Sequence, residues 1–326
     1  MIPLKIVQER EPEESLIYPL VEFYRFNDYR RYRSVDTTAG KRYLKGMLQE
    51  ILTGDDTRSW FAYAGDSLVG LAVVTHLVWD SNYFGLPMAS LTVIVIDDEP
   101  CRNFEIADKL LSKALPDALC QKHQHLTVRV DTEETGLIHA LEKHGFRLMD
   151  TLATYAYHRG KSKLPEMPPN YDVCKYSPED YDAVLDIAKT SYKDYPNRFT
   201  LDPNIPRDRA QSFYTEWAKN CCNGKMAEEI LVAKRKGRTV GFLAYRSNQA
   251  LLRHTGIRLM GSGLAGFYPI RVNAYYDLIL EGIRLNPGLS GDFETHLWNT
   301  TFINFFSQLD FHYVRAKHSF HRWLGS

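Results

Sequence analysis

The sequence has few cysteines and no net charge, and each of these shortages excludes a class of protein. Only five of the 326 residues are cysteine, the number is odd, and no Cys-x-x-Cys pair occurs. Such cysteine usage argues against a disulfide framework or a zinc site and favours a reducing compartment. Lysine plus arginine and aspartate plus glutamate number 40 each, so the net charge is zero. Overall charge therefore gives no reason to expect nucleic acid or an anionic membrane as a partner.

The sequence also lacks an apolar run that is long enough to cross a bilayer. Its first residues, Met1-Ile2-Pro3-Leu4-Lys5, do not have the pattern of a secretory signal peptide. We therefore expect a cytoplasmic protein with no membrane partner and no metal. The 326 residues suit two domains of ordinary size, and 44% hydrophobic with 25% charged residues is typical of globular proteins.

The most informative feature that is present is a repeat with a period of about 170 residues. Residues 59–72 and residues 230–244 both have the pattern of a β-hairpin with a central glycine turn. Each hairpin is followed by a strand and then by a Pro-x-Arg sequence that opens a helix, at Pro100 and at Pro269. A period this long indicates a duplicated domain, because solenoid repeats are much shorter.

The duplication predicts two domains of the α/β class. We expect an N-terminal domain at residues 1–162 and a C-terminal domain at residues 171–326. The intervening stretch, Gly160 to Asn170, is rich in proline and polar residues and has no period, as in a linker. In each domain the expected order is a strand, two helices, a meander, a helix, a strand, a helix and a strand. This order predicts a mixed, mostly antiparallel sheet flanked by helices.

The order of elements resembles the GNAT superfamily of N-acetyltransferases, and the chain resembles two GNAT domains in tandem. Three stretches resemble the dTDP-fucosamine acetyltransferases in particular: Phe213-Tyr214-Thr215-Glu216-Trp217-Ala218-Lys219-Asn220 followed by Gly224, Asn197-Arg198-Phe199, and Trp79-Asp80-Ser81-Asn82-Tyr83-Phe84-Gly85. The resemblance covers most of both halves. It implies an acyl-CoA-dependent N-acyltransferase that moves acetyl from acetyl-CoA to a primary amine of a small molecule by direct attack. A nucleotide-linked amino sugar is the acceptor that the second resemblance suggests.

The resemblance also implies where acetyl-CoA binds. In this fold the thioester and the pantetheine arm lie along the backbone of one central strand, whose N–H and C=O groups are not used by a neighbouring strand. The matching residues are Leu264, Ala265, Gly266 and Phe267. The small residues would permit close backbone approach. The alternative is an ordinary buried strand in which the glycine serves packing.

A diphosphate loop follows in the family, with the pattern Arg/Gln-x-x-Gly-x-Gly/Ala at a helix N-terminus. The matching residues of the C-terminal half are Arg271, Val272, Asn273, Ala274 and Tyr276, where Ala274 replaces a glycine. In the N-terminal half Glu105 stands at that glycine position. A carboxylate there would repel a diphosphate, so we expect the N-terminal domain to be degenerate and to bind no cofactor.

The final family motif is an asparagine with a tyrosine seven residues later, which protonates the departing thiolate. Asn299 matches the first position, but Phe306 stands at the second. A general acid contributes roughly 10²–10⁴-fold, whereas alignment of the reactants contributes about 7–11 kcal/mol and would survive. We therefore expect a slower enzyme or a relocated acid, with Tyr313 as the first candidate and Tyr275 or Tyr276 as others. The alternative for each of these tyrosines is a packing role, which is the more common one.

No spacing singles out the general base or the acceptor pocket. Glu294 is the first candidate base, followed by His296 and His254. For the acceptor the resemblance implies Arg198, Tyr214 and Trp217, since aromatic rings stack on planar or sugar faces and arginine binds diphosphate. Trp217 could instead extend a buried helix stripe with Phe213.

The main alternative to an enzyme is a GNAT-like scaffold that has lost its chemistry and binds a ligand or partner. Phe306 and the degenerate diphosphate loops favour this alternative, while Asn299 favours the enzyme. Nucleic-acid binding has support only from the stretch Tyr29 to Arg33, which we expect to be a solvated helix face. An oligomer remains compatible with the sequence.

Overall fold

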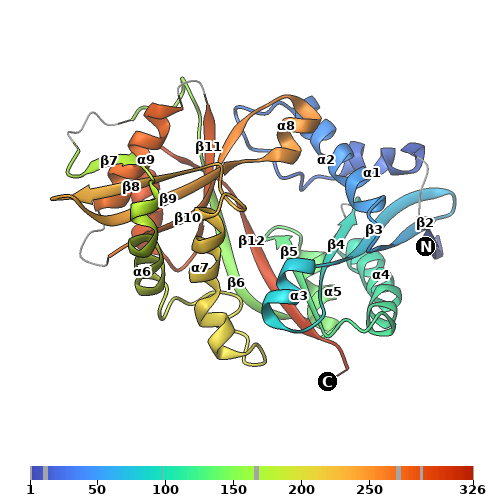
Figure 1. Cartoon of the computed structure of the whole chain (residues 1–326). Coiled ribbons are helices and arrows are strands. Elements are labelled where there is room, and N and C mark those ends of the chain that lie inside the picture. Colours follow the sequence, from blue (N-terminus) through green and yellow to red (C-terminus); the bar gives the residue numbers. More distant parts are fainter. Residues whose placement is uncertain are drawn as a thin grey trace. The chain divides into compact units, whose positions relative to one another are not determined.

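The computed structural model of the protein describes residues 2–9, 14–97, 99–164, 169–268, 273–286 and 289–325 (Figure 1). The chain forms two compact units. Unit 1 consists of residues 1–152 and 315–326, and unit 2 consists of residues 153–314. Residues 153–162 belong to unit 2 and residues 315–326 to unit 1, whereas the predicted domains divide between residues 162 and 171.

Unit 1 contains most of the elements of the first half of the chain. Its strands are β1 (Leu4–Glu9), β2 (Thr57–Ala64), β3 (Ser67–His76), β4 (Met88–Val95) and β5 (His125–Asp131), with parts of β6 (Arg147–Tyr157) and β12 (His312–Trp323). Its helices are η1 (Glu14–Ile17), α1 (Tyr18–Phe23), α2 (Thr37–Leu52), α3 (Val78–Phe84), α4 (Pro100–Cys120) and α5 (Thr135–Lys143).

The sheet of unit 1 is buried on both faces. Strands β1 to β5 follow one another in hydrogen-bonded order, and β12 lies next to β5. These neighbours pair antiparallel, except that β4 and β5 run parallel. In β3, Leu71 and Val73 pack with α1 and α2, whereas Ala72 and Val74 pack with α4. Because side chains alternate between the two faces, a strand that is covered on both sides is an unbroken apolar run.

Unit 2 repeats this arrangement. Its strands are β7 (Asp172–Lys175), β8 (Glu229–Arg235), β9 (Arg238–Ser247), β10 (Leu259–Phe267) and β11 (Ser290–His296), and its helices are η2 (Pro178–Asp180), α6 (Tyr181–Ser191), α7 (Arg207–Cys222), α8 (Gln249–Thr255), α9 (Asn273–Leu285) and α10 (Thr300–Gln308). Phe242 and Ala244 of β9 pack on the face covered by α6 and α7, while Leu243 and Tyr245 pack on the face of α9 and α10. Both units thus have the predicted mixed, mostly antiparallel sheet flanked by helices.

The last strand of each half is exchanged, which the sequence did not predict. Residues 317–323 of β12 pair antiparallel with β5, and Phe320 is only 1% exposed in the core of unit 1. Figure 1 shows the red C-terminal part of β12 running beside β5. Conversely, Ala153, Tyr155 and Tyr157 of β6 belong to the core of unit 2. Each unit is therefore completed by strand residues from the other half of the chain.

The segment between α1 and α2 is an irregular loop, so the prediction of a solvated helix face for Tyr29 to Arg33 is wrong. Tyr29 and Tyr32 are buried, with ring centroids 4.9 Å apart. Arg30 lies 3.1 Å from Asp131, and a neighbouring arginine, Arg31, lies 2.6 Å from Glu133. The sequence suggested a helix face open to solvent, but the two tyrosines pack inward while Arg30 and Arg31 bind carboxylates of unit 1.

The same loop carries a carboxylate that holds β12 in unit 1. Asp28 forms ion pairs with Arg315, at 3.2 Å, and with Lys317. Burial opposes the ionisation of Asp28, but these two cations outweigh burial and hold its pKa well below the ordinary value. A half-buried carboxylate that is paired in this way stays charged, and it fixes the exchanged strand by charge as well as by backbone pairing.

A second carboxyl group of this region has the opposite behaviour. Glu134 is 5% exposed, and the Tyr24 hydroxyl donates a hydrogen bond to its Oε1 at 3.0 Å. Burial raises the pKa of Glu134 to about 8, and the nearby Asp131 also disfavours the charged form. Near neutral pH the folded protein therefore holds a proton on Glu134 that the unfolded chain would release.

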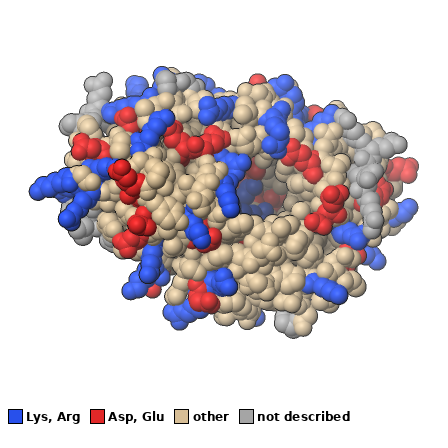
Figure 2. Space-filling view, viewed as in Figure 1, with Lys and Arg blue, Asp and Glu red and all other residues tan. Residues whose placement is uncertain are grey.

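Within the described ranges, no helix is both long enough and apolar enough to cross a membrane. Basic and acidic side chains are interspersed over most of the face that Figure 2 presents, in keeping with the zero net charge.

We predict that a polypeptide of residues 1–162 will not unfold cooperatively. It lacks β12, so β5 loses its antiparallel partner and the core of unit 1 loses Phe320. Adding a synthetic peptide of residues 312–325 should restore a cooperative thermal transition, measured by circular dichroism. The same peptide with Phe320→Ser is the matched control and should not restore it. A sharp transition of residues 1–162 alone would contradict the role of the exchanged strand.

Glu134→Gln should stabilise the protein increasingly as the pH rises. Below the unfolded value near 4.5 the glutamate is protonated in both states, and between 4.5 and about 8 the wild type loses stability because folding opposes ionisation. Above that window the difference should level off. Thermal melts at pH 5 and pH 8.5 measure it, and each kcal/mol corresponds to about 2–4 °C.

The exposed neighbour Glu133 is the control for this effect. A hydrogen bond from Arg31 lowers the pKa of Glu133, so Glu133→Gln should lose a little stability at pH 8.5 and gain none. A Glu134→Gln effect of the same size at both pH values would show that burial does not control this carboxyl group.

Candidate active site

The candidate site lies where two neighbouring strands of unit 2 separate. β10 pairs antiparallel with β9 from Met260 to Phe267, with one register shift, but its described parallel pairing with β11 covers only Leu259 to Gly261. Just beyond, the register of β10 shifts at Gly263, where an added Cβ would lie 3.2 Å from the Ala244 carbonyl oxygen. A bulge of this kind re-aims the backbone. One edge of β10 is thus turned away from β11.

Unit 1 has the same separation, because β4 and β5 pair only from Met88 to Ser90 among the described residues. The start of the following helix, however, is already occupied by the protein itself. Glu99 caps α4 and accepts hydrogen bonds from the backbone N–H groups of Cys101, at 3.2 Å, and Arg102, at 2.7 Å. These hydrogen bonds lower the pKa of Glu99 and keep it ionised. A carboxylate therefore holds the position at which a diphosphate would bind.

The starts of the two helices of unit 1 also lie in close contact. A Cβ on Gly136, at the start of α5, would lie 2.8 Å from the Pro100 carbonyl oxygen and 2.9 Å from the Phe104 nitrogen. The starts of α4 and α5 thus touch, and only glycine permits it. Glu105, which we expected to repel a diphosphate, instead forms an ion pair with Arg102 at 2.6 Å. The obstacle in unit 1 is Glu99 and the helix contact rather than Glu105.

In unit 2 the corresponding helices are separated by aromatic rings. The Phe302 ring of α10 lies 4.6 Å from Tyr275 of α9 and 5.9 Å from Phe267 of β10. Tyr276 contacts Phe305 at 4.8 Å. Side chains can rearrange more readily than two touching backbones, so a flexible arm would meet less resistance between α9 and α10 than between α4 and α5.

The residues predicted for the cofactor strand divide between its two faces. Ala265 and Phe267 pack towards α9 and α10, whereas Leu264 packs with α6 and α7. A Cβ on Gly266 would lie 2.8 Å from the Phe242 ring and 3.2 Å from Ile187. Packing alone therefore explains this glycine.

The residues predicted for the diphosphate loop are only partly described. Arg271 and Val272 lie outside the described residues. Asn273 is the exposed first residue of α9, and Ala274 behind it is fully buried.

Hydroxyl groups at the end of α6 cover the open edge of β10. The Phe267 N–H donates to Ser191 Oγ at 3.1 Å, and the same hydroxyl donates to the Phe267 carbonyl oxygen at 2.8 Å. The Tyr192 hydroxyl donates to the Ala265 carbonyl oxygen at 2.5 Å. We expected these backbone groups to be unused. A pantetheine amide could use them only by replacing the hydroxyls of α6.

The α10 helix has the expected cap but a buried phenylalanine at the acid position. Asn299 accepts a hydrogen bond from the Phe302 N–H at 3.4 Å. Phe306 is fully buried, and its ring stacks on Tyr155 at 5.3 Å. The ring of Tyr313, a 48% exposed residue, lies 5.9 Å from Tyr155. Burial raises the pKa of Tyr155 and, more strongly, that of Tyr275, so neither gives up its proton readily.

An aromatic cluster lies beside the open edge of β10. Its members are Tyr192, Tyr195, Tyr214, Trp217, His296 and Trp298. Tyr192 and Tyr214 stack with ring centroids 3.9 Å apart, and Trp217 lies nearly parallel to Tyr214. Two of the predicted acceptor residues therefore share a surface of parallel rings. Arg198 lies over the Phe199 ring, with its guanidinium carbon 4.6 Å from the centroid.

The cluster contains a pair of groups that can exchange protons. The Tyr195 hydroxyl lies 3.0 Å from His296 Nδ1, and which of them donates depends on the histidine tautomer. His296 is 7% exposed at the end of β11. Glu294 faces the same side of β11 two residues earlier and is exposed, with Thr154 Oγ1 donating to it at 3.4 Å. Sequence reasoning proposed both β11 residues but missed Tyr192 and Tyr195, whose signal is a tyrosine pair just upstream of Arg198.

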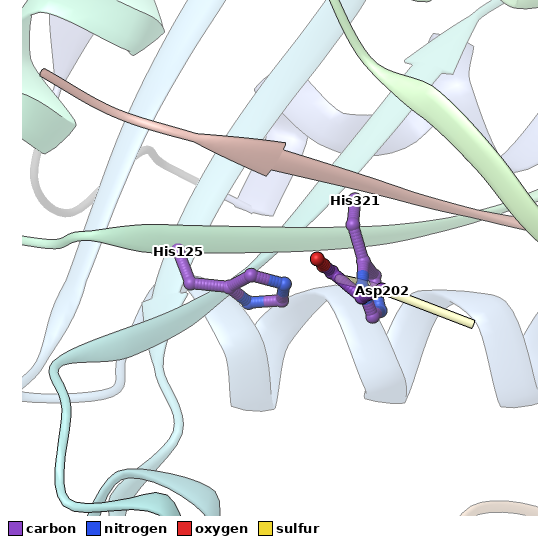
Figure 3. A group of neighbouring side chains, drawn as sticks. All are labelled: His125, Asp202 and His321. Atoms are coloured by element: carbon purple, nitrogen blue, oxygen red, sulfur yellow. The ribbon is translucent and has the colours of Figure 1, made fainter. Parts of the chain in front are cut away.

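Two buried histidines of unit 1 lie outside this site. His125 of β5 and His321 of β12 sit on paired strands with ring centroids 4.3 Å apart, as Figure 3 shows. Both side chains are almost completely buried. They lie where the exchanged strand β12 pairs with β5, and not where β10 and β11 separate.

No protein-family model matches the chain. Among curated proteins, the chain is similar to the spore coat polysaccharide biosynthesis protein SpsD of Bacillus subtilis (strain 168), with 24% identity over 201 residues. The match covers 61% of this chain and 66% of SpsD, which is slightly less than two thirds of that relative.

Two solved structures extend the comparison to the whole chain. A GCN5-related N-acetyltransferase from Sphaerobacter thermophilus has a TM-score of 0.61 at 13% identity, over 98% of this chain and 95% of that one. A tandem GNAT protein from the clavulanic acid biosynthesis pathway, solved without AcCoA, has a TM-score of 0.55 at 13% identity over 99% of both chains. Likeness at such identity concerns the fold. The chain therefore has the tandem GNAT fold, as the repeat and the order of its elements predicted.

Proposed function

We propose that the protein is an acyl-CoA-dependent N-acyltransferase that transfers acetyl from acetyl-CoA to a primary amine of a small molecule. The observation that carries the proposal is the separation of β10 and β11 after three paired residues, with the Gly263 bulge beside it. The freed edge of β10 lies beside Ser191 and Tyr192, whose hydroxyls a cofactor amide would have to replace, and beside the aromatic rings of α9 and α10. In unit 1, Glu99 and the contact at Gly136 oppose binding, so we propose one site, in unit 2.

Acetyl transfer by direct attack needs a neutral amine. The amine nitrogen forms a bond to the thioester carbonyl carbon, the carbon–sulfur bond breaks, and one proton must move from nitrogen to the thiolate in the overall reaction. A thiol with a pKa near the ~8.5 of cysteine can leave without full protonation. The base is therefore the more demanding role, and Phe306 is compatible with turnover.

His296 is the base that we favour. Asp292 pairs with Gly261, and His296 and Ala265 each lie four residues further along the two diverging strands. Tyr192 donates to the Ala265 carbonyl oxygen, and Tyr195, whose ring lies 5.1 Å from Tyr192, hydrogen-bonds His296, so this tyrosine pair joins the two strands. If His296 Nδ1–H donates to the Tyr195 oxygen, the other ring nitrogen, Nε2, is the atom that can accept the proton of the amine. Tyr195 then sets the tautomer and orientation of the imidazole. Glu294 and Tyr313 stay alternative candidates.

For the acceptor we propose a nucleotide-linked amino sugar. The parallel rings of Tyr214 and Trp217 offer a surface for a base or sugar face, and Arg198 precedes them as a phosphate ligand. The described role of SpsD in spore coat polysaccharide biosynthesis supports a sugar-related acceptor.

A second candidate function is a scaffold that has lost catalysis. Two observations favour it: Phe306 is part of the core, and the hydroxyls of Ser191 and Tyr192 already use the backbone groups of β10. Calorimetric titration with acetyl-CoA separates the two candidates. Absence of binding at sub-millimolar acetyl-CoA would favour the scaffold.

His296→Gln should lower kcat by roughly 10²–10⁴-fold with amine acceptors, because it removes the general base. Tyr195→Phe should cause a smaller loss and move the acidic limb of the kcat/KM pH profile, since the imidazole loses its partner. Initial rates of thiol release measure both. Tyr181→Phe, at the other end of α6, is the control. Wild-type rates and pH profile in both site variants would remove this pair from the mechanism.

Arg198→Ala should raise the KM of a nucleotide-linked amino sugar by roughly 10–100-fold, as expected for one charged hydrogen-bonding group. The affinity for acetyl-CoA should stay the same. Arg207→Ala, an exposed arginine at the start of α7, provides the comparison. If the acceptor KM does not change, the nucleotide-sugar proposal loses its main support while acyl transfer itself is unaffected.

A further inference from the structure

A group of cations without a described carboxylate partner lies at the tip of the β8–β9 hairpin. Arg235, Lys236 and Arg238 are exposed and, with Val240, line a surface hollow of about 640 Å³. Figure 2 shows basic side chains projecting at the left end of the view, where Figure 1 places this hairpin. The neighbouring Lys234 behaves differently, because it forms an ion pair with the buried Asp180 at 2.9 Å. In the described part of the chain, no ion pair is formed by the three cations at the tip.

The hairpin holds two of these cations directly opposite each other. Arg235 pairs with Arg238 across the turn, and the two turn residues have positive φ, 49° for Lys236 and 73° for Gly237. A non-glycine residue in this conformation is uncommon. Directly opposed like charges destabilise an antiparallel pair. In the protein alone the two arginines repel each other. An anion bound between them would attract both, so the interaction energy of the group would become favourable.

The hairpin tip lies beside the end of β10 and the start of α9. The Tyr268 N–H donates to the Val240 carbonyl oxygen at 3.2 Å. A Cβ on Gly241 would lie 3.3 Å from the Ala274 Cβ, in the first turn of α9. Arg238 is two residues from Val240, which is about 7 Å along an extended strand. An arginine side chain can span that distance to an anion near the start of α9.

Unit 1 offers a comparison inside the same molecule. The matching β2–β3 hairpin has Gly65 and Asp66 at its tip, so an acidic residue replaces the cations. The helix that follows in unit 1 is capped by Glu99. In unit 2 the hairpin is basic, and no carboxylate among the described residues caps the helix that follows. In unit 1 the hairpin is acidic, and Glu99 already caps that helix.

We infer that Arg235 and Arg238 bind the 3′-phosphate of the CoA nucleotide, and that Lys236 adds positive charge at the same place. The inference rests on the proposed function and adds to it a site that selects between forms of the co-substrate. A phosphate monoester carries close to two negative charges and accepts forked hydrogen bonds from arginine. The protein should consequently distinguish acetyl-CoA from acetyl-3′-dephospho-CoA, which has the same thioester, pantetheine and diphosphate.

The test is a calorimetric titration of the full chain with these two ligands. Wild type should bind acetyl-CoA about tenfold more tightly than the dephospho form, a ratio that corresponds to about 1.4 kcal/mol. Arg235→Gln with Arg238→Gln should abolish that preference and leave binding of the dephospho form unchanged. Lys5→Gln with Lys113→Gln, two exposed lysines of unit 1, changes the net charge equally and is the matched control. Lys236→Asn removes the third charge with a residue that tolerates positive φ.

The outcomes separate this inference from the proposed function. Equal binding of both ligands by the wild type overturns the phosphate site while leaving acyl-CoA binding intact. An unchanged preference in the double variant, or an equal loss for both ligands, also overturns it. If the wild type binds neither ligand, both the phosphate site and the proposed function fall. Competition by adenosine 3′,5′-bisphosphate but not by inorganic phosphate at the same concentration would identify the nucleotide as the source of the phosphate.

Discussion

The separation of β10 from β11 is the constraint on which the rest of the candidate site depends. Backbone N–H and C=O groups must find partners, and a strand that leaves its neighbour after Gly261 needs new ones. In this protein Ser191 and Tyr192 supply them from the end of α6. The aromatic cluster lies beside the same opening. Tyr195 follows Tyr192 in the chain and contacts His296 at the end of the neighbouring strand.

The two units show how one fold can keep or lose an anion site by a few side chains. A helix start has unsatisfied N–H groups that attract negative charge. In unit 1 the chain satisfies two of them with Glu99 and brings the starts of α4 and α5 into contact at Gly136. Unit 2 has cations at its hairpin and rings between its helices. The two units therefore share the same helices and strands but differ in the side chains that would meet an anion.

Much of the fold could be predicted from the sequence, and less of the site. Hydrophobic runs and glycine turns predicted both hairpins, which are β2–β3 and β8–β9 in the structure. Such features depend on neighbours in the sequence. The strand exchange could not be predicted because β12 has the same alternation whichever strand it pairs with. Tyr195 and His296 are 101 residues apart and meet only through the tertiary fold. Glu99 lies just outside the diphosphate-loop pattern, so the pattern indicated only Glu105, whose charge Arg102 neutralises.

The exchanged strand has a consequence for the order in which the protein can form. Residues 1–152 are synthesised before unit 2, yet β5 waits for residues 317–323, which follow unit 2 in the chain. Until then its edge and the space for Phe320 are exposed, as in other folds that depend on distant pairing. The half of the molecule that is encoded first is thus the half that is finished last, and the closing contact between Asp28 and Arg315 marks its completion.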